Sequence, residues 1–344
     1  MAKKADNFPR NICVDLTYRC PARCGFCFLR KSGQLNRGGA ELSAVRMGRI
    51  IDALPPQRNF YLTGGEPFVR KDTAKIVRMI KSRGHYAMLT TNGLLLSGRD
   101  LAALFSAGLD TLVVSLHGGR REHDAALGVK GAFDKVRKLA SVFEHMRGRM
   151  GTRLELWCTI NPNNYARLAE TAREMAALKP DAVNFNHLEF ILGKDWESTS
   201  DILGKAGLLS AAKASGRAVP PAIDPATLYV ETEKIRRMAI PGLRFSPDLS
   251  KKEMAEWYGT GTGLRRTGRC HGQWDSVWLS PSGEFYSCQP LAIQLGKAEG
   301  RKPWEPLLGK KYAALRRLLT KSGGFLPACF RCGRATHSGS RASK

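Results

Sequence analysis

Short apolar runs alternate with amphipathic segments over roughly the first half of the chain. The apolar runs are short, rich in β-branched and aromatic residues, and bounded by turn residues, which is typical of strands. The segments between them repeat apolar residues at helical spacing. The predicted strands cover 11–17, 59–67, 86–93, 111–118, 153–164 and 182–190. The predicted helices cover 42–54, 73–84, 98–108, 132–146 and 165–178.

This alternation predicts an α/β fold with a parallel sheet. Parallel neighbours need a crossover connection, and each connection here carries a helix. Six strands with their helices make a partial (β/α)6 barrel, short of the eight that close a full one. In such folds the chemistry lies at the carboxyl ends of the strands. We therefore expect the functional residues directly after each strand.

The second half of the chain has a weaker pattern. After the barrel core, which we place at 1–192, residues 193–268 are small and polar in their first part and contain one helix, at 225–239; we expect a lid or linker there. Within 269–334, two short strands flank the turn sequence "PSG" and predict a hairpin in a small C-terminal α+β domain. Residues 335–344 are expected to be disordered.

The composition is strongly basic, with a formal net charge of +25. Between 301 and 344 there are eleven Lys or Arg and one acidic residue. Such a balance fits nucleic acid, an anionic membrane surface, an acidic substrate or merely a solvated basic surface. No run of about 18 uncharged apolar residues predicts a membrane span, and "MAKKADNFPR" lacks the apolar stretch of a signal peptide. A cytoplasmic protein with reduced cysteines is expected.

Three cysteines follow the first predicted strand within eight residues: Cys20, Cys24 and Cys27. A structural zinc site needs four ligands, and no fourth Cys or His occurs within forty residues downstream. Three thiolates suit a [4Fe–4S] cluster with one iron left open for another ligand. Taken alone, the loop also admits zinc or a redox thiol.

The spacing of this loop resembles the signature of the radical S-adenosylmethionine (SAM) superfamily, Cys-x3-Cys-x2-Cys with the aromatic Phe26 before the last cysteine. Further motifs follow the next strands in the order that the superfamily shows. They are "GGEP" (64–67), "TTNG" (90–93), "VVSLHG" (113–118), "HDAALGVKGAFDKV" (123–136) and "TINPNN" (159–164). The resemblance extends over residues 11–190.

The resemblance implies a cluster on the three cysteines that reductively cleaves SAM to a 5′-deoxyadenosyl radical, which takes a hydrogen atom from the substrate. It also implies a flavodoxin- or ferredoxin-like electron donor. The residues expected to bind SAM are Phe26, Gly64, Gly65, Glu66, Pro67, Thr91, Asn92, Ser115 and Asn161. Glu66 should offer its carboxylate to an ammonium group, and the two glycines should let the backbone approach the ligand.

Three polar residues at the same end of the predicted barrel are candidates for catalysis: His117, His187 and Glu189. The alternative is that each is a polar residue whose hydrogen bonds are satisfied at the barrel rim. Cys13 and Cys158 lie within apolar strands and are expected to be buried rather than reactive.

Four more cysteines occur near the C-terminus: Cys270, Cys288, Cys329 and Cys332. The first two form C-x12-G-x4-C around Gly283, and the last two form CxxC. This series resembles the twitch domain, the shortened form of the SPASM extension of radical SAM enzymes. It implies an auxiliary [4Fe–4S] cluster held by four cysteines. A four-cysteine zinc site is the alternative, although only one CxxC knuckle is present.

The leading functional hypothesis is a radical SAM oxidoreductase of the twitch or SPASM type. Its substrate would be a peptide, or a carboxylated or phosphorylated small molecule such as a natural-product or cofactor precursor. A radical SAM enzyme acting on RNA through the basic C-terminal region is the alternative. A non-catalytic iron–sulfur or zinc scaffold is a third possibility, which the intact "GGEP" disfavours.

Overall fold

The computed structural model describes residues 8–147, 151–209, 219–261 and 269–333, and it contains one sheet of ten strands in the order β10-β9-β8-β1-β2-β3-β4-β5-β6-β7. All six predicted strands are present, and they pair in parallel with their sequence neighbours. They are β1 (Asn11–Asp15), β2 (Asn59–Thr63), β3 (Tyr86–Thr91), β4 (Thr111–Ser115), β5 (Arg153–Thr159) and β6 (Ala182–Asn186). The α/β class and the partial barrel are therefore confirmed.

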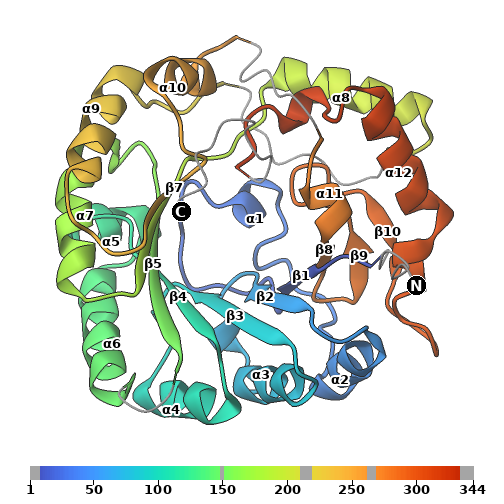
Figure 1. The fold of residues 1–344 in the computed structure, drawn as a ribbon, viewed down its shortest axis with the longest axis horizontal. Helices are drawn as coiled ribbons and strands as arrows, with labels where there is room; N and C mark the ends of the chain where they lie inside the picture. The colour runs from blue at the N-terminus through green and yellow to red at the C-terminus, as the bar shows by residue number, and fades with distance from the viewer. Residues whose placement is uncertain (1–7, 148–150, 210–218, 262–268, 334–344) are drawn as a thin grey trace, which may run out of the picture.

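Helices cover the convex side of this curved sheet, while the short helix α1 (Phe28–Lys31) lies on its concave side (Figure 1). Each predicted helix is found between the strands that were expected to flank it. The helices of this layer are α2 (Ala44–Ala53), α3 (Thr73–Ser82), α4 (Gly98–Ala107), α5 (Arg120–Leu127), α6 (Ala132–Met146) and α7 (Leu168–Ala177). α4 shows why the boundaries could be predicted: Ser97 and Asp100 form a capping box, and Gly108 ends the helix with a φ of 80°.

The two faces of the sheet differ in chemistry because side chains alternate along each strand. On β1, Ile12 and Val14 are fully buried in the apolar core beneath the helices. Asn11, Cys13 and Asp15 point to the opposite, concave face. The same alternation along the other strands gives a polar and aromatic concave face on an apolar core.

The described part of residues 193–268, where a lid or linker is expected, adds a strand to the sheet. It contains α8 (Gly193–Lys205), α9 (Pro225–Arg236), α10 (Lys251–Tyr258) and a strand, β7 (Leu243–Ser246), that pairs in parallel with β6. The sequence analysis missed β7 because it has only four residues, one of them an exposed arginine. The sheet thus has seven parallel strands from β1 to β7, and the helix predicted at 225–239 is present as α9.

The C-terminal hairpin joins the same sheet. β8 (Ser276–Leu279) pairs in parallel with β1, and β9 (Glu284–Tyr286) and β10 (Gln294–Lys297) continue it as antiparallel neighbours. The turn between β8 and β9 holds the predicted "PSG". Around these strands lie α11 (Gly272–Asp275), η4 (Glu305–Leu308), α12 (Lys310–Lys321) and η5 (Pro327–Cys329). The division into three domains stays a prediction, and the tail 335–344 lies outside the described residues.

No helix in the described ranges has the length and apolar character needed to cross a membrane.

Candidate active site at the carboxyl ends of the strands

The residues predicted to be functional in the first half of the chain all follow the carboxyl ends of strands. The cysteine loop follows β1, and "GGEP" connects β2 to the short helix η1 (Pro67–Val69). Thr91 ends β3 and Ser115 ends β4. The parallel sheet therefore brings these segments to one edge, as expected.

Glu66 is the centre of the bonds between these segments, and it is fully buried. Its Oε1 accepts hydrogen bonds from the Thr91 hydroxyl at 2.7 Å and the Phe68 N–H at 3.1 Å. Its Oε2 accepts a hydrogen bond from the Asn92 N–H at 2.8 Å. Both oxygens hold the "GGEP" loop to the end of β3, and the role expected for Glu66 toward an ammonium group stays a prediction.

Asn92 carries this connection on to the cysteine loop. Its side-chain Nδ2 lies 3.5 Å from Cys20 Sγ, and its Oδ1 accepts a hydrogen bond from the Leu94 N–H at 3.0 Å. An amide donor at a sulfur stabilises the thiolate relative to the thiol. Asn92 is therefore the expected SAM-site residue that the structure places directly against a cysteine.

Gly64 and Gly65 are needed where the "GGEP" loop crosses the base of the cysteine loop. A Cβ on Gly64, whose φ is 120°, would lie 2.4 Å from the Thr17 carbonyl oxygen. A Cβ on Gly65 would lie 2.3 Å from the Arg19 carbonyl oxygen. The Gly65 N–H donates to the Thr17 carbonyl at 2.7 Å, so the close approach predicted for these glycines is to the protein backbone.

The three thiols of the cysteine loop are partly exposed. Burial, together with the neighbouring thiols of the loop, raises the pKa of Cys20 to about 11 and that of Cys24 to about 12. Without a cation these thiols hold their protons, and a bound metal would displace them. Phe26 packs beside Cys20 and Cys24 on a small apolar cluster at the end of α5 and the start of α6.

His117 makes structural contacts in this site, and the catalytic role expected for it stays a prediction. Its Nδ1 accepts a hydrogen bond from the Thr159 N–H at 3.1 Å, so the ring proton is on Nε2. Burial, with a contribution from His123, lowers the pKa of His117 to about 3. The ring stands edge-on to Phe26 at 5.0 Å between centroids. A neutral imidazole with its acceptor occupied connects β4, β5 and the cysteine loop.

Two more of the expected SAM-binding residues differ in their freedom to bind a ligand. Asn161 is fully buried, donating to the Thr159 carbonyl and accepting from the Asn163 N–H, both at 2.9 Å. Its amide is thus committed to its own turn. Ser115 is half-buried, and its hydroxyl makes no hydrogen bond to another described residue. Ser115 stays available to a ligand at this edge.

His187 and Glu189 connect the end of β6 to later segments. His187 Nδ1 lies 2.9 Å from the Tyr258 hydroxyl, and its ring packs 6.0 Å from the Trp257 ring. Glu189 Oε1 accepts a hydrogen bond from the Gly333 N–H at 2.7 Å, just after the C-terminal CxxC. These contacts connect α10 and the C-terminal segment to the barrel, and the catalytic roles expected for the two residues stay predictions.

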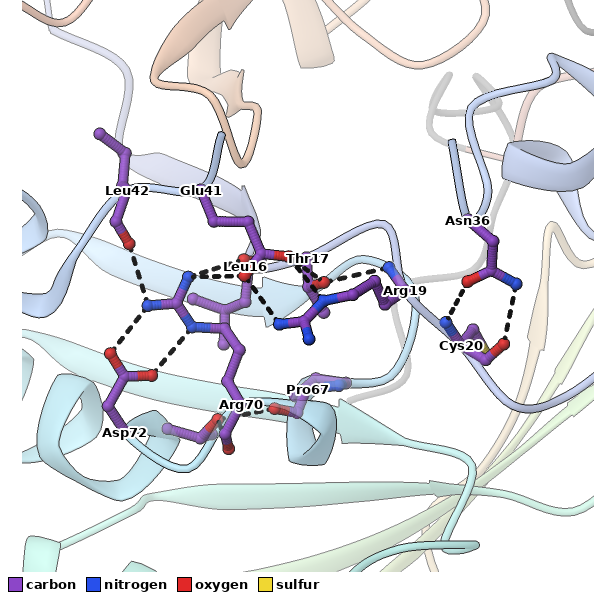
Figure 2. Close-up of polar contacts among 11 residues, drawn as sticks. Leu16, Thr17, Arg19, Cys20, Asn36, Glu41, Leu42, Pro67, Arg70 and Asp72 are labelled. Carbon is purple, nitrogen blue, oxygen red and sulfur yellow. Dashed lines mark hydrogen bonds and ion pairs between the residues drawn. The ribbon is translucent and has the colours of Figure 1, made fainter. Parts of the chain in front are cut away.

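A polar network around Arg70 and Glu41, which the sequence analysis missed, lies beside the start of the cysteine loop (Figure 2). Arg70 is buried and donates to the Leu16 carbonyl at 3.2 Å and the Leu42 carbonyl at 2.9 Å. It also makes a two-point ion pair with Asp72, at 2.9 and 2.8 Å. Glu41 lies 3.5 Å away on the other side of the guanidinium. The fork of an arginine suits such two-sided pairing.

Glu41 extends the network to the cysteine loop itself. It accepts a hydrogen bond from the Thr17 hydroxyl at 2.5 Å and forms two bonds with the Arg19 guanidinium, at 3.1 and 2.9 Å. Beyond Arg19, the Asn36 side chain bonds both the N–H and the carbonyl of Cys20, at 2.9 and 3.1 Å. Figure 2 shows the two groups on either side of the start of the loop.

The C-terminal cysteines lie in two pairs. Cys270 and Cys288 are half-buried, and both act electrostatically on Tyr312, whose pKa burial raises to about 12. Cys329 ends η5 and is buried, and the N–H of Cys332 donates to the Cys329 carbonyl at 3.3 Å. Among the residues that the structure describes, no three Cys, His, Asp or Glu are grouped to hold a single metal ion. In an iron–sulfur cluster each thiolate binds its own iron.

Arg331 lies inside the C-terminal CxxC and is almost fully buried. Its guanidinium donates to the Trp257 carbonyl at 2.7 Å and to the Gly259 and Gly261 carbonyls at 3.0 Å. It also pairs with Asp195 of α8 at 2.9 Å. One side chain therefore fixes the CxxC segment to α8 and to the end of α10, which no sequence motif indicated.

The comparison with protein families matches residues 14–147 to the model described as "Radical SAM superfamily". This match covers β1 to α6, including every residue around Glu66. This segment, which is less than half of the chain, is similar to the radical SAM superfamily.

Curated relatives match the radical SAM segment and part of the chain beyond it. The chain is 38% identical over 112 residues to the "PqqA peptide cyclase" of Rhodopseudomonas palustris, covering 32% of this chain and 29% of the relative. It is 29% identical over 185 residues to the protein of the same name from Granulibacter bethesdensis, covering 52% and 48%. The chain thus spans about half the length, or less, of the curated relatives it matches.

Solved structures share the fold at low sequence identity. Streptococcus suis SuiB matches with a TM-score of 0.59 and 17% identity, over 82% of this chain and 60% of that one. A structure described as native anSMEcpe with bound AdoMet matches with a TM-score of 0.59 and 14% identity, over 88% and 82%. BtrN in complex with AdoMet and 2-DOIA matches with a TM-score of 0.51 and 12% identity, over 98% and 97%.

The residues of the radical SAM segment suit an iron–sulfur cluster and SAM. The donor set is three thiols on one loop, with an amide proton directed at one of the sulfurs. Thiolates are the ligands that such clusters use. The uncommitted hydroxyl of Ser115 lies at the same edge of the sheet. Cys20, Cys24 and Cys27 would hold the cluster.

The pH dependence of stability tests the buried state of Glu66. Burial raises the pKa of Glu66 to about 7, whereas an unfolded glutamate has a pKa of about 4.3. The folded protein binds this proton more tightly, so the stabilisation is fully present below about pH 4 and is lost as the pH rises to about 7. In Glu66→Gln this loss should be absent. We expect the difference in unfolding free energy between wild type and variant to fall by about 3 kcal/mol from pH 4.5 to 7.5.

Urea denaturation of both proteins at closely spaced pH values measures this difference. If the unfolding free energies of the two proteins changed in parallel from pH 4.5 to 7.5, Glu66 would be ionised in the folded protein over that range.

Proposed function

We propose that this chain is a radical SAM enzyme that binds a [4Fe–4S] cluster at Cys20, Cys24 and Cys27 and abstracts a hydrogen atom from a peptide. When bound, the cluster and SAM supply reductive cleavage of SAM and the radical chemistry. The observation that carries the proposal is the continuous bonding from Cys20 through Asn92 to Glu66. It holds the cysteine loop, "GGEP" and "TTNG" as one unit.

In this unit the protein's own residues position the cysteine loop and the loops on which a ligand would lie. The Asn92 amide orients Cys20, and Glu66 fixes the loops on which a ligand would lie. Because these bonds exist before any ligand binds, little rearrangement is needed on binding. The uncommitted Ser115 hydroxyl is the side chain that we assign to SAM.

A peptide is the substrate class that the relatives favour. Two curated relatives are named PqqA peptide cyclase, and matching solved structures include SuiB "bound to precursor peptide SuiA" and anSMEcpe with "Kp18Cys peptide". We also propose that the four C-terminal cysteines hold an auxiliary cluster and that a flavodoxin- or ferredoxin-like protein supplies the electron. No described contact supports the RNA alternative, and part of the basic region on which it depends lies outside the described residues.

Anaerobic reconstitution tests this function. The protein should bind about eight irons per chain, corresponding to two four-iron clusters, and should form 5′-deoxyadenosine from SAM with a strong reductant. Candidate peptides, chosen from short genes beside the coding gene, should increase that formation and lose or rearrange hydrogen in mass spectra. No deoxyadenosine from a fully iron-loaded protein would contradict the proposal.

A further inference from the structure

A cleft of about 160 Å³ lies between the cysteine loop with α1 on one side and the β8–β10 strands on the other. One wall begins at Phe28, directly after Cys27, and the other includes Gln289, directly after Cys288. The cleft thus lies between the two sets of cysteines. Its lining residues are Tyr18, Phe28, Ser32, Gln34, Ser280, Ser282, Glu284, Tyr286, Gln289, Ala292 and Gln294.

The lining contains no Lys, Arg or His, although the chain has a net charge of +25. Glu284 is half-buried there and forms no ion pair with any described residue. Its Oε2 accepts a hydrogen bond from the Gln294 side chain at 3.2 Å. Lys297, the cross-strand neighbour of Glu284, is exposed, lies 4.0 Å from Glu299 and does not line the cleft. The carboxylate of Glu284 therefore leaves a local negative charge inside the cleft.

Two phenols in the same cleft are oriented by a buried carboxylate. Asp15 is fully buried, and its Oδ2 accepts hydrogen bonds from the Tyr286 hydroxyl at 2.5 Å and the Tyr18 hydroxyl at 3.4 Å. Since each O–H is used toward Asp15, each phenol oxygen can offer only lone pairs to a ligand.

The serines at the edge of the cleft are committed in a similar way. Ser280 Oγ accepts a hydrogen bond from the Glu284 N–H and shares another with the Ser282 hydroxyl, both at 2.9 Å. The charged and phenolic groups of the cleft are therefore acceptors: the Glu284 carboxylate and two phenol oxygens. The amides of Gln34 and Gln289 can turn either the carbonyl or the NH2 group toward a ligand. An ammonium group carries three donors and no acceptor, and a guanidinium carries five, so these groups complement it.

We propose that this cleft binds a cationic, donor-rich group, an ammonium or a guanidinium. That the group belongs to the enzyme's substrate depends on the proposed function; the binding preference itself does not. The overall basic charge favoured an acidic substrate, but the charge inside the cleft has the opposite sign.

Equilibrium dialysis of the reconstituted protein against small probes tests the preference. The probes are N-acetyl-lysine methylamide and N-acetyl-norleucine methylamide, which share the carbon chain and differ in the ammonium group. We expect the lysine probe to bind about tenfold more tightly or better, as a charged hydrogen bond to Glu284 would give. Glu284→Gln should remove that preference. Glu299→Gln, an exposed carboxylate outside the cleft, should retain it.

Formation of 5′-deoxyadenosine by the same preparations separates the two proposals. If the protein prefers the lysine probe but forms no 5′-deoxyadenosine, the cation-binding assignment of the cleft is supported and the proposed function is contradicted. Deoxyadenosine without a lysine preference, or an unchanged preference in a folded Glu284→Gln protein, overturns the cleft assignment. Thermal unfolding of each variant shows whether it is folded.

Discussion

Replacing Cys24 with serine is expected to abolish 5′-deoxyadenosine formation and to lower the iron content from about eight to about four per chain. Cys24 is the middle thiol of the loop, and burial with both neighbouring thiols raises its pKa to about 12. The proposed cluster would bind this residue as its thiolate. A serine hydroxyl does not supply a thiolate.

Cys158→Ala is the matched control for this variant. Its thiol is fully buried near the end of β5 and accepts a hydrogen bond from Asn164 at 3.4 Å. The Asn164 amide also donates to the His117 and Thr159 carbonyls, so its loss leaves no orphaned donor. Iron and activity should be retained. If Cys24→Ser kept the iron and the deoxyadenosine of the wild type, the cysteine loop would not hold the cluster.

Arg331→Met is expected to destabilise the C-terminal segment by about 3–5 kcal/mol, the cost of removing one partner of a buried ion pair. It would leave the Asp195 carboxylate and three backbone carbonyls without their donor. Burial already raises the pKa of Asp195 and lowers that of Arg331, so each charge is costly on its own. We expect a lower unfolding temperature and loss of iron from the C-terminal cysteines only.

The double variant Arg331→Met, Asp195→Leu separates charge from packing. Removing both charges should recover part of the stability, because replacing a whole buried pair by apolar side chains costs less than breaking it. Arg317→Met, at an exposed position of α12, should leave stability within about 0.5 kcal/mol of the wild type. Equal unfolding temperatures for Arg331→Met and Arg317→Met would refute the anchoring role.

The strands and helices of the first half could be predicted because their residues follow simple local patterns. On β1, Ile12 and Val14 point to the core, and α4 begins and ends with ordinary capping residues. The type and order of the elements follow from these patterns alone. The parallel sheet then placed the motifs at one edge.

α8 shows where pattern reading failed. Its buried positions are Asp195, Thr199 and Leu203, a correctly spaced stripe with two polar members. Those two are buried because Asp195 pairs with Arg331 and the Thr199 hydroxyl accepts a hydrogen bond from the Ala328 N–H at 2.9 Å. Because these partners are distant in sequence, nothing near α8 in the sequence indicates that its polar residues are buried. The segment therefore resembled a polar loop in the sequence.

The position of the site residues could be predicted, whereas their hydrogen-bond partners could not. Motif spacing placed Glu66 and His117 at the right strand ends. What each does depends on donors contributed by other strands, Thr91 and Asn92 for Glu66 and the Thr159 N–H for His117. A sequence shows that a polar residue lies near a site, whereas its hydrogen-bond partners decide whether it is free to act.

The pairing of β1 with β8 also bears on how the chain is made. On one side, β1 pairs through Asn11 to Val14 with Ser276 to Leu279 of β8. That side stays unpaired until nearly the whole chain has been synthesised. Proteins fold from the N-terminus as they emerge, and an open strand edge can capture another chain. During that interval the loop that follows β1 is in the nascent protein while its final neighbour is still inside the ribosome. The rate of translation therefore governs how long this edge is open to aggregation.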